Sequence, residues 1–269
     1  MTARKRHPAR AKGRKYPTEI SSVAWMDLLG YGAMLKQVGF DPSHPQAEAA
    51  IDRLKTFQTV IASFATKHFP AMPINDGVAF FHDLSPRTNL VTYEFLEQAI
   101  NVHKAVNELE EQKGQPGARM VIAVGARMRI SGVVRGDLGH KKSIFKRVND
   151  GVINADQAVH EAFRSGPIAG FVPQLQANFA FTKAYCADDS GGSAGLGGNR
   201  CYVDLCLFND PHPSWITFSR KQSWSMDGME TTFGELKDFK RQIGRHNEVD
   251  GILNALEIAE RLGILHALD

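Results

Sequence analysis

Long apolar runs and paired cysteines are both missing from this sequence. No apolar run approaches the roughly 18 residues that a membrane-spanning helix needs. The basic start is followed by no long apolar segment, so we expect neither a secretory signal nor a membrane span. The three cysteines, Cys186, Cys201 and Cys206, are odd in number and form no CxxC pair, which excludes a disulfide framework or a zinc site. We therefore expect reduced thiols and a cytoplasmic protein.

The body of the chain also lacks a basic excess. The 269 residues contain 32 Lys and Arg against 29 Asp and Glu, a formal net charge of +3. Seven basic residues and no acid lie in the first fifteen positions, so residues 16–269 carry a net charge of −4. A domain that clamps nucleic acid over its whole surface carries its basic excess on the fold, and this one does not. We expect contact with nucleic acid only through the basic arm at 1–19, if at all, and such arms are most often simply solvated.

The composition that is present, 43% apolar and 23% charged, is typical of a folded globular protein. Alternating or continuous apolar residues predict strands, and three- and four-residue spacing predicts helices. The predicted strands lie at 22–27, 78–82, 119–125, 200–208 and 215–219. The predicted helices lie at about 45–67, 92–113, 155–164, 175–187 and 233–243, with a last helix bearing Val249, Ile252, Leu256 and Ala259. This order predicts one α/β (α+β sandwich) domain over 20–269, with a basic insertion at about 126–170.

Two aspartates occupy positions where chemistry would use them. Asp27 ends the first strand beside a Gly-Tyr-Gly turn, and Asp76 stands in the turn that opens the next strand. If these strands are neighbours, both carboxylates meet at one edge of the sheet, where Mg²⁺ or Mn²⁺ bind oxygen ligands. Two such ions can clamp the attacking and leaving oxygens of a phosphoryl transfer. Taken singly, each aspartate is equally well explained as an ordinary turn residue.

The two motifs together resemble the class III nucleotide cyclase catalytic domain. That family opens with a strand reading apolar-x-Asp-Ile-x-Gly-Phe, and this chain has Trp25-Met26-Asp27-Leu28-Leu29-Gly30-Tyr31. About fifty residues later the family has a β-hairpin with a second metal aspartate, and this chain has Ile74-Asn75-Asp76-Gly77-Val78-Ala79-Phe80. The resemblance covers residues 20–125 well and 170–220 loosely, and it implies a central, mostly antiparallel sheet with flanking helices.

The resemblance implies an intramolecular reaction of a ribonucleoside triphosphate. Two divalent cations, Mg²⁺ or Mn²⁺, would be held by Asp27, Asp76 and the backbone carbonyl of Leu28, with Gly30 and Tyr31 against the substrate. The ribose 3′-hydroxyl would attack the α-phosphate and expel pyrophosphate, helped mainly by geometry and charge neutralisation. Because sites of this fold lie between two catalytic domains, the resemblance also implies a head-to-tail homodimer.

Two positions depart from the purine-specific members of that family. The residue four before the second aspartate is lysine in adenylate cyclases and glutamate in guanylate cyclases, and here it is Met72. Methionine can pack on a ring but cannot pair with a purine edge; it is equally well explained as an apolar residue covering the core. The transition-state pair, Asn followed four residues later by Arg, is half present as Asn178 with Thr182. Either Lys183 reaches in or another element of the dimer supplies the cation, although an Asn on a helix is usually just solvated.

Charged residues elsewhere complete the interpretation. Arg127 or Arg129, after the strand at 119–125, could hold the triphosphate. Asp188 and Asp189 could bind a cation, yet two acids after a helix usually face solvent.

These departures resemble the pyrimidine cyclases of the Pycsar antiphage systems, which make cyclic UMP or cyclic CMP for a separate effector reached through the product. Preference for UTP over CTP rests on that resemblance alone. A purine cyclase with an unusual pocket, a catalytically silent nucleotide-binding module and a protein that binds nucleic acid through its arm remain the alternatives.

Overall fold

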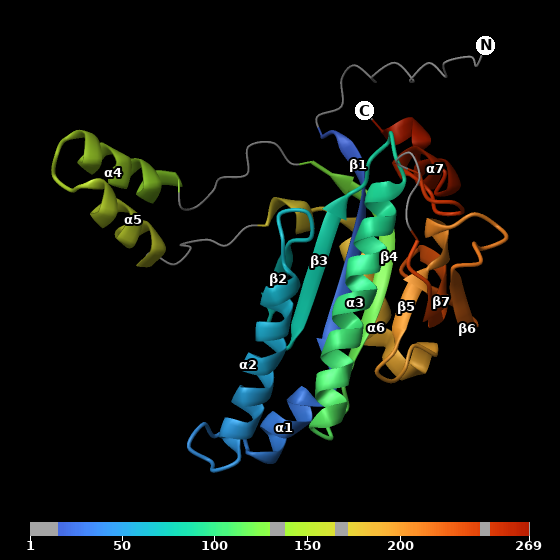
Figure 1. Cartoon of the computed structure of the whole chain (residues 1–269), viewed down its shortest axis with the longest axis horizontal. Coiled ribbons are helices and arrows are strands. Elements are labelled where there is room, and N and C mark those ends of the chain that lie inside the picture. Colours follow the sequence, from blue (N-terminus) through green and yellow to red (C-terminus); the bar gives the residue numbers. More distant parts are fainter. Residues whose placement is uncertain (1–15, 130–137, 165–171, 243–247, 269) are drawn as a thin grey trace.

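The computed structural model describes residues 16–129, 138–164, 172–242 and 248–268. Seven strands form one sheet in the order β2-β3-β1-β4-β5-β7-β6 (Figure 1). The strands are β1 (Thr18–Leu28), β2 (Ala71–Ile74), β3 (Gly77–Asp83), β4 (Ala118–Met128), β5 (Cys201–Asp204), β6 (Ile216–Met226) and β7 (Met229–Phe239). Only β4 and β5 pair in parallel, and every other neighbouring pair is antiparallel. The predicted mixed α/β class with a mostly antiparallel central sheet is confirmed.

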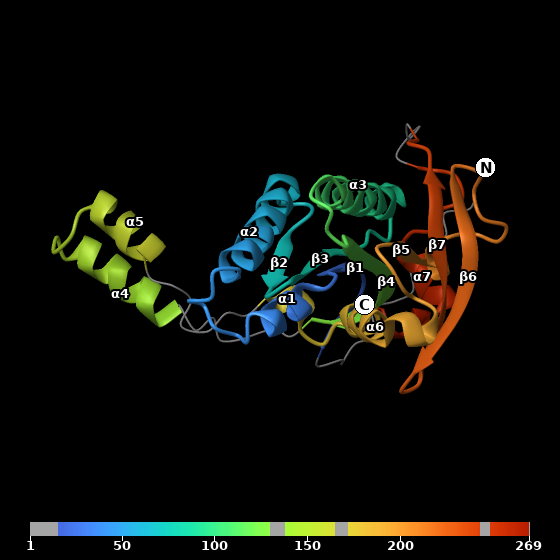
Figure 2. The same ribbon diagram turned by 90° about the horizontal axis from the view of Figure 1, so that it is seen from below.

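Helices cover both faces of the sheet, and its central strands are therefore buried on both sides. Ala24 and Met26 of β1 point into a core shared with α2 (Ala47–Phe64), α3 (Leu90–Gln112) and α7 (Ala255–Arg261). Val23 and Trp25, on alternate positions, point into a second core closed by α6 (Phe179–Ser190). Figure 2 shows α2 and α3 on one side of the sheet and α6 on the other. The face of β1 that carries Asp27 is therefore the α6 face.

The remaining helices are short or lie in the predicted insertion. Helix α1 (Tyr31–Gln37) follows β1 directly, and a 3-10 turn follows β5 at Leu205–Leu207. Within the predicted insertion, α4 (Leu138–Asn149) and α5 (Ala155–Arg164) pack against each other. Strand β4 continues to Met128, inside that predicted insertion, while residues 130–137 and 165–171 lie outside the described ranges. None of the helices in the described ranges is long and apolar enough to cross a bilayer.

The predicted helix at 233–243 is wrong, because residues 233–239 belong to strand β7; residue 243 lies outside the described ranges. Asp227 and Gly228 both have positive φ, 50° and 82°, which makes the tight turn that joins two strands into a hairpin. Strand β6 accordingly runs to Met226 rather than ending near 219. The Asp-Gly pair between two alternating segments was the sequence signal for this hairpin.

Three other boundaries also differ from the predictions. Strand β5 ends at Asp204, whose side chain accepts a hydrogen bond from the Cys206 amide and starts a 3-10 turn. Helix α7 begins at Ala255, because Asn254 and Glu257 form a capping box there, so Val249 and Ile252 precede it. Strand β1 begins at Thr18, so the last two residues of the predicted arm belong to the sheet; positions 1–15 lie outside the described ranges.

Candidate functional site

Asp27 and Asp76 come together at one end of β1. Strand β1 lies between β3 and β4, and Asp27 is opposite Gly77 on one side and Arg119 on the other. The β2–β3 turn brings Asp76 to the end of β1, where the Leu28 amide donates to the Asp76 carbonyl at 3.1 Å. Gly77 permits this close approach, since a Cβ there would lie 2.3 Å from the Trp25 ring. The structure thus places the two predicted aspartates, with the Leu28 backbone, at the C-terminal end of β1.

The Asp27 carboxylate is half-buried among like charges. Burial first, then the charges of Asp188 and Asp76, raise the pKa of Asp27 to about 7, against the opposing effect of Arg119. Among the described residues, no hydrogen bond or ion pair engages this carboxylate. By contrast, Asp76 Oδ1 accepts a hydrogen bond from Asn75 Nδ2 at 2.7 Å. The Asp27 carboxylate therefore has no partner among the described residues and is available to bind a ligand.

Gly30 and Tyr31 border the two aspartates. Gly30 adopts the left-handed conformation, with φ 76°, and lets the chain turn from β1 into α1. Tyr31 is buried, and burial together with the nearby Asp76 charge raises the pKa of its phenol. The structure therefore brings both predicted substrate-binding positions to the same end of β1.

Asp188 lies at this site, although the sequence favoured a solvent-facing position for it over the cation-binding alternative. It is buried, not solvent-facing: its carboxylate accepts from Arg119 Nε at 2.5 Å and from Trp25 Nε1 at 3.2 Å. Burial raises the pKa of Asp188, while the hydrogen bond and charge of Arg119 lower it. Helical spacing was the available signal, because Asp188 follows buried Ala180 and Ala184 by eight and four residues on one stripe of α6. We call Asp27, Asp76, Asp188 and Arg119 the carboxylate cluster.

The carboxylate cluster fits a divalent cation that a phosphate substrate helps to hold. Two aspartates and a backbone carbonyl are hard oxygen donors of the kind that Mg²⁺ and Mn²⁺ prefer. Within the described ranges, no three or more His, Cys, Asp or Glu side chains converge as an all-protein cage. Mg²⁺ commonly binds through one or two carboxylates, substrate phosphates and water, and this donor set matches that pattern.

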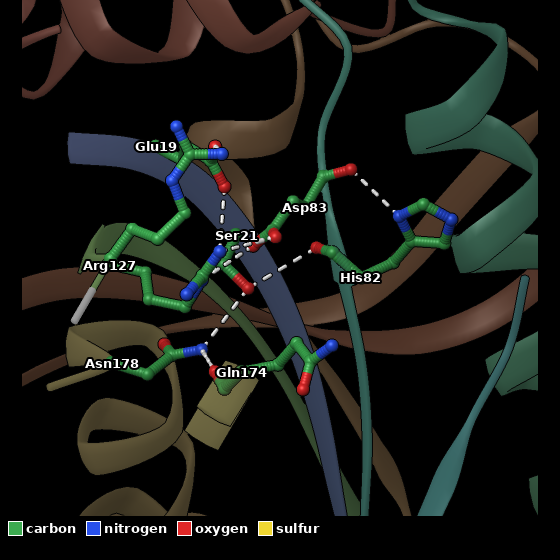
Figure 3. Close-up of polar contacts among 8 residues, drawn as sticks. Glu19, Ser21, His82, Asp83, Arg127, Gln174 and Asn178 are labelled. Carbon is green, nitrogen blue, oxygen red and sulfur yellow. Dashed lines mark hydrogen bonds and ion pairs between the residues drawn. The ribbon is translucent and has the colours of Figure 1, made fainter. Parts of the chain in front are cut away.

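A second polar group lies at the opposite end of β1 (Figure 3). Arg127 donates Nε to Asp83 Oδ1 at 2.8 Å and Nη2 to Asp83 Oδ2 at 2.6 Å, and the same Nη2 reaches Glu19 Oε2 at 2.6 Å. Arg129, with a side chain 54% exposed, pairs with Glu19 Oε1 at 3.1 Å. Glu19 and Asp27 are eight residues apart on the strand, so the two groups are separated by about 27 Å. The structure does not bring Arg127 or Arg129 to Asp27 or Asp76 of their own chain.

Asn178 belongs to this second group. It precedes α6 rather than lying on a helix at 175–187, and its Oδ1 caps the helix by accepting from the Phe181 amide at 3.0 Å. Its Nδ2 donates to Ser21 Oγ at 3.2 Å and to the Gln174 carbonyl at 2.7 Å (Figure 3). A backbone bridge joins it to Arg127. We call Glu19, Asp83, Arg127, Arg129 and Asn178 the Arg127 cluster.

Lys183 does not take the role that the sequence suggested for it. Its ammonium is buried, donating to the Val124 carbonyl at 2.8 Å and to Asp204 Oδ2 at 2.9 Å. Asp204 has 0% side-chain exposure and also accepts from Thr231. Moving Lys183 toward a substrate would leave a buried carboxylate without its cation, at large cost. Of the two alternatives for the cation, the burial of Lys183 between α6, β4 and β5 favours another element of the dimer over Lys183.

Met72 lies opposite Ala79 in the β2–β3 hairpin and packs, half-buried, against the core beneath α6. The reading of Met72 as an apolar residue covering the core is therefore supported.

Comparisons with known proteins returned solved structures alone. No family model matches the chain, and no curated protein matches it. The guanylyl cyclase Cya2 is similar with a TM-score of 0.45 and 11% identity, over 83% of this chain and 94% of that one. The catalytic core of a rhodopsin-guanylyl cyclase with converted specificity, bound to ATPalphaS, is similar with a TM-score of 0.44 and 8% identity, over 84% and 100%.

The guanylate cyclase domain of RhGC from Catenaria anguillulae, bound to GTP, is similar with a TM-score of 0.39 and 6% identity, over 82% of this chain and 98% of that one. Because all three TM-scores lie below 0.5, we base neither a family nor an activity on them.

Proposed function

We propose that the protein is a nucleotide cyclase that converts a ribonucleoside triphosphate, UTP or else CTP, to its 3′,5′-cyclic monophosphate and pyrophosphate. The observation that carries the proposal is the meeting of Asp27 and Asp76 at one end of β1, with the Asp27 carboxylate unengaged by any described residue. A half-buried carboxylate among like charges is costly for folding, and binding a cation offsets that cost.

The chain's own groups would bind and orient the substrate. Asp27, Asp76 and the Leu28 carbonyl would hold two divalent cations, Mg²⁺ or Mn²⁺, and the turn at Gly30 and Tyr31 would lie against the phosphates. When bound, the cations supply Lewis-acid polarisation of the α-phosphate and a lowered pKa of the 3′-hydroxyl. The bond from the 3′-oxygen to the α-phosphorus forms as the α–β anhydride bond breaks, so pyrophosphate leaves and the hydroxyl proton passes to solvent.

A head-to-tail homodimer would complete the site. The carboxylate cluster and the Arg127 cluster lie at opposite ends of β1, on its α6 face, since Glu19, Ser21 and Asp27 share one side of the strand. A twofold axis between two copies can therefore set the carboxylate cluster of one protomer opposite the Arg127 cluster of its partner, twice per dimer. Arg129, whose side chain is half-exposed, would then contact the triphosphate in place of Lys183. Arg127 and Asn178 are buried beside it and would hold the end of β1 and the start of α6 that face the partner.

We favour a pyrimidine base because the hairpin offers no polar side chain at Met72 to pair with a purine edge. The diffusible cyclic nucleotide would then reach a separate effector in the cytoplasm, as an antiphage signal, without protein–protein contact. The competing candidate is a silent nucleotide-binding module, and the specific observation in its favour is the burial of Lys183 beside Asp204.

The deciding experiment incubates the purified protein with Mn²⁺ and each of the four labelled ribonucleoside triphosphates. Cyclic product from UTP or CTP alone supports the proposal, product from ATP or GTP replaces it with a purine cyclase, and no product supports the silent module. Asp27→Asn and Asp76→Asn should each lower turnover by at least about 10³-fold with an unchanged circular dichroism spectrum. Asp41→Asn is the matched control, because the Asp41 side chain is exposed and, within the described ranges, is hydrogen-bonded only to Ser43.

A further inference from the structure

Arg119 and Asp27 are direct neighbours that do not pair. They face each other across the β1–β4 ladder, where an arginine opposite an aspartate ordinarily forms a cross-strand ion pair. Instead, Arg119 donates Nε to Asp188 Oδ1 at 2.5 Å and Nη2 to the Asp188 carbonyl at 2.7 Å. The ion pairs of the described residues include Arg119 with Asp188 and none that joins it to Asp27.

The Asp188 side chain is itself held in place. Its second carboxylate oxygen accepts from Trp25 Nε1 at 3.2 Å, and the Trp25 ring makes edge contacts with Phe181 and Tyr185 of α6. The exposed side-chain fractions of Asp188 and Arg119 are 8% and 12%. Two hydrogen bonds, a charge-assisted one to the Asp188 carboxylate and one to the Asp188 backbone carbonyl, fix the guanidinium.

Without its bonds to Asp188, Arg119 could pair with Asp27 instead. Its charge already acts on Asp27, where it opposes the rise in pKa that burial and the neighbouring acids cause, so the guanidinium is within electrostatic reach. If Arg119 formed an ion pair with Asp27, it would occupy the carboxylate oxygen atoms that a metal cation needs, and its positive charge would repel that cation.

We propose that Asp188 is a positioning residue of the metal site, which takes up Arg119 and so leaves the Asp27 carboxylate open to a divalent cation. This inference rests on the proposed function, since it concerns the same cation site. Asp188 acts through Arg119 and Asp27 and makes no contact with the substrate.

The test measures binding of Mn²⁺ alone to the full-length protein by electron paramagnetic resonance. Asp188→Asn keeps the shape and the acceptor for Trp25 but loses the charge, so Arg119 turns to Asp27 and Mn²⁺ affinity falls about tenfold. The double variant Asp188→Asn with Arg119→Gln lacks the competitor and regains most of the affinity, as a coupled pair should. A merely structural role for Asp188 would give no such rescue. Asp189→Asn, its exposed neighbour on α6, is the matched control and binds as the wild type.

Two results would overturn the inference: wild-type affinity in Asp188→Asn, or a double variant as weak as the single one. Absence of Mn²⁺ binding to the wild type overturns it as well. Nucleotide assays keep the two ideas apart. Mn²⁺ binding with the predicted rescue but no cyclic product leaves Asp188 as a positioning residue and rejects the cyclase, whereas cyclic product with unchanged affinity in Asp188→Asn does the opposite.

Discussion

At the scale of the residue, the carboxylate cluster holds negative charge that the fold does not neutralise. Asp188 is compensated by Arg119, and Asp76 is half-exposed and hydrogen-bonded by Asn75. No described residue gives the Asp27 side chain an ion pair or a hydrogen bond, and burial with its acidic neighbours raises its pKa to about 7. Sites that bind cations keep such residues although they weaken the apo fold.

The first prediction is that Asp27→Asn stabilises the protein when divalent cations are removed. The pKa of Asp27 is about 7 in the folded protein against an ordinary 3.8, so the unfolded chain loses this proton first as the pH rises. The contribution of Asp27 to stability is therefore lost between about pH 4 and pH 7 and stays low above that range. Thermal melts in EDTA should show Asp27→Asn several degrees more stable than wild type at pH 8 and equal to it near pH 4. A lower melting temperature at pH 8 would contradict the burial of an unengaged charge.

The second prediction concerns Gly77, whose missing side chain admits the Trp25 ring. A Cβ would lie 2.3 Å from that ring, so Gly77→Ala must displace either Trp25 or the turn that carries Asp76. We expect a loss of about 1–3 kcal/mol in the free energy of unfolding, measured in urea, and weaker Mn²⁺ binding. Gly32→Ala on α1 meets no atom within 4 Å and should leave stability equal or higher. Equal effects of the two substitutions would argue against the close packing at Gly77.

At the scale of the element, helices were easier to anticipate than strand partners. The apolar stripe of α3 and the continuous apolar run of β4 predict those elements to within a few residues. The 233–243 segment was assigned to a helix because helical and strand spacing are hard to separate in a short, partly polar segment. Residues 233–239 are extended because they pair with β5 and β6 on either side.

The third prediction belongs to α3, which is joined to the sheet through His103. The His103 Nε2 atom lies 3.0 Å from the Ala118 carbonyl, and burial lowers the pKa of His103 to about 4. Because the unfolded chain takes up this proton first as the pH falls, the contribution of His103 to stability falls by up to about 3 kcal/mol between about pH 6.5 and pH 4, opposite in sign to that of Asp27. Urea unfolding of wild type and His103→Gln at pH 7.5, 5.5 and 4 isolates this contribution as the difference between the two proteins. That difference should change with pH by the stated amount, and the exposed His68→Gln should show no such change; a pH-independent difference for His103→Gln would contradict the prediction.

At the scale of the whole molecule, the two clusters occupy opposite ends of one strand, and a single protomer cannot bring them together. Eight residues of extended β1 separate Glu19 from Asp27, a span that no side chain bridges. A complete site of the proposed kind therefore depends on a second copy of the chain.

The fourth prediction is that two inactive variants complement each other when mixed. Asp27→Asn removes the carboxylate half of each site, and Arg129→Gln removes the exposed cation of the other half. After dissociation and reassociation, half of the dimers are mixed and each mixed dimer has one intact site, so activity should return to roughly a quarter of wild type.

The control for complementation mixes Asp27→Asn with Asp76→Asn. Both substitutions fall in the carboxylate cluster, so every mixed dimer keeps two damaged sites and no activity should return. Recovery in this control, or none in the test mixture, would contradict a site shared between protomers.

The sequence by itself determined the local features of this protein: the apolar periodicity of its main helices, the turn at Asn75-Asp76-Gly77, and the two aspartates at strand ends. These depend on spacing and turn chemistry over a few residues. Only the tertiary structure decided that Asp188 binds Arg119, that Lys183 is buried beside Asp204, and that Asn178 lies with Arg127. The two ion pairs join residues that are 69 positions apart (Arg119 and Asp188) and 21 positions apart (Lys183 and Asp204). Strand register and helix packing, rather than sequence spacing, bring these residues into contact.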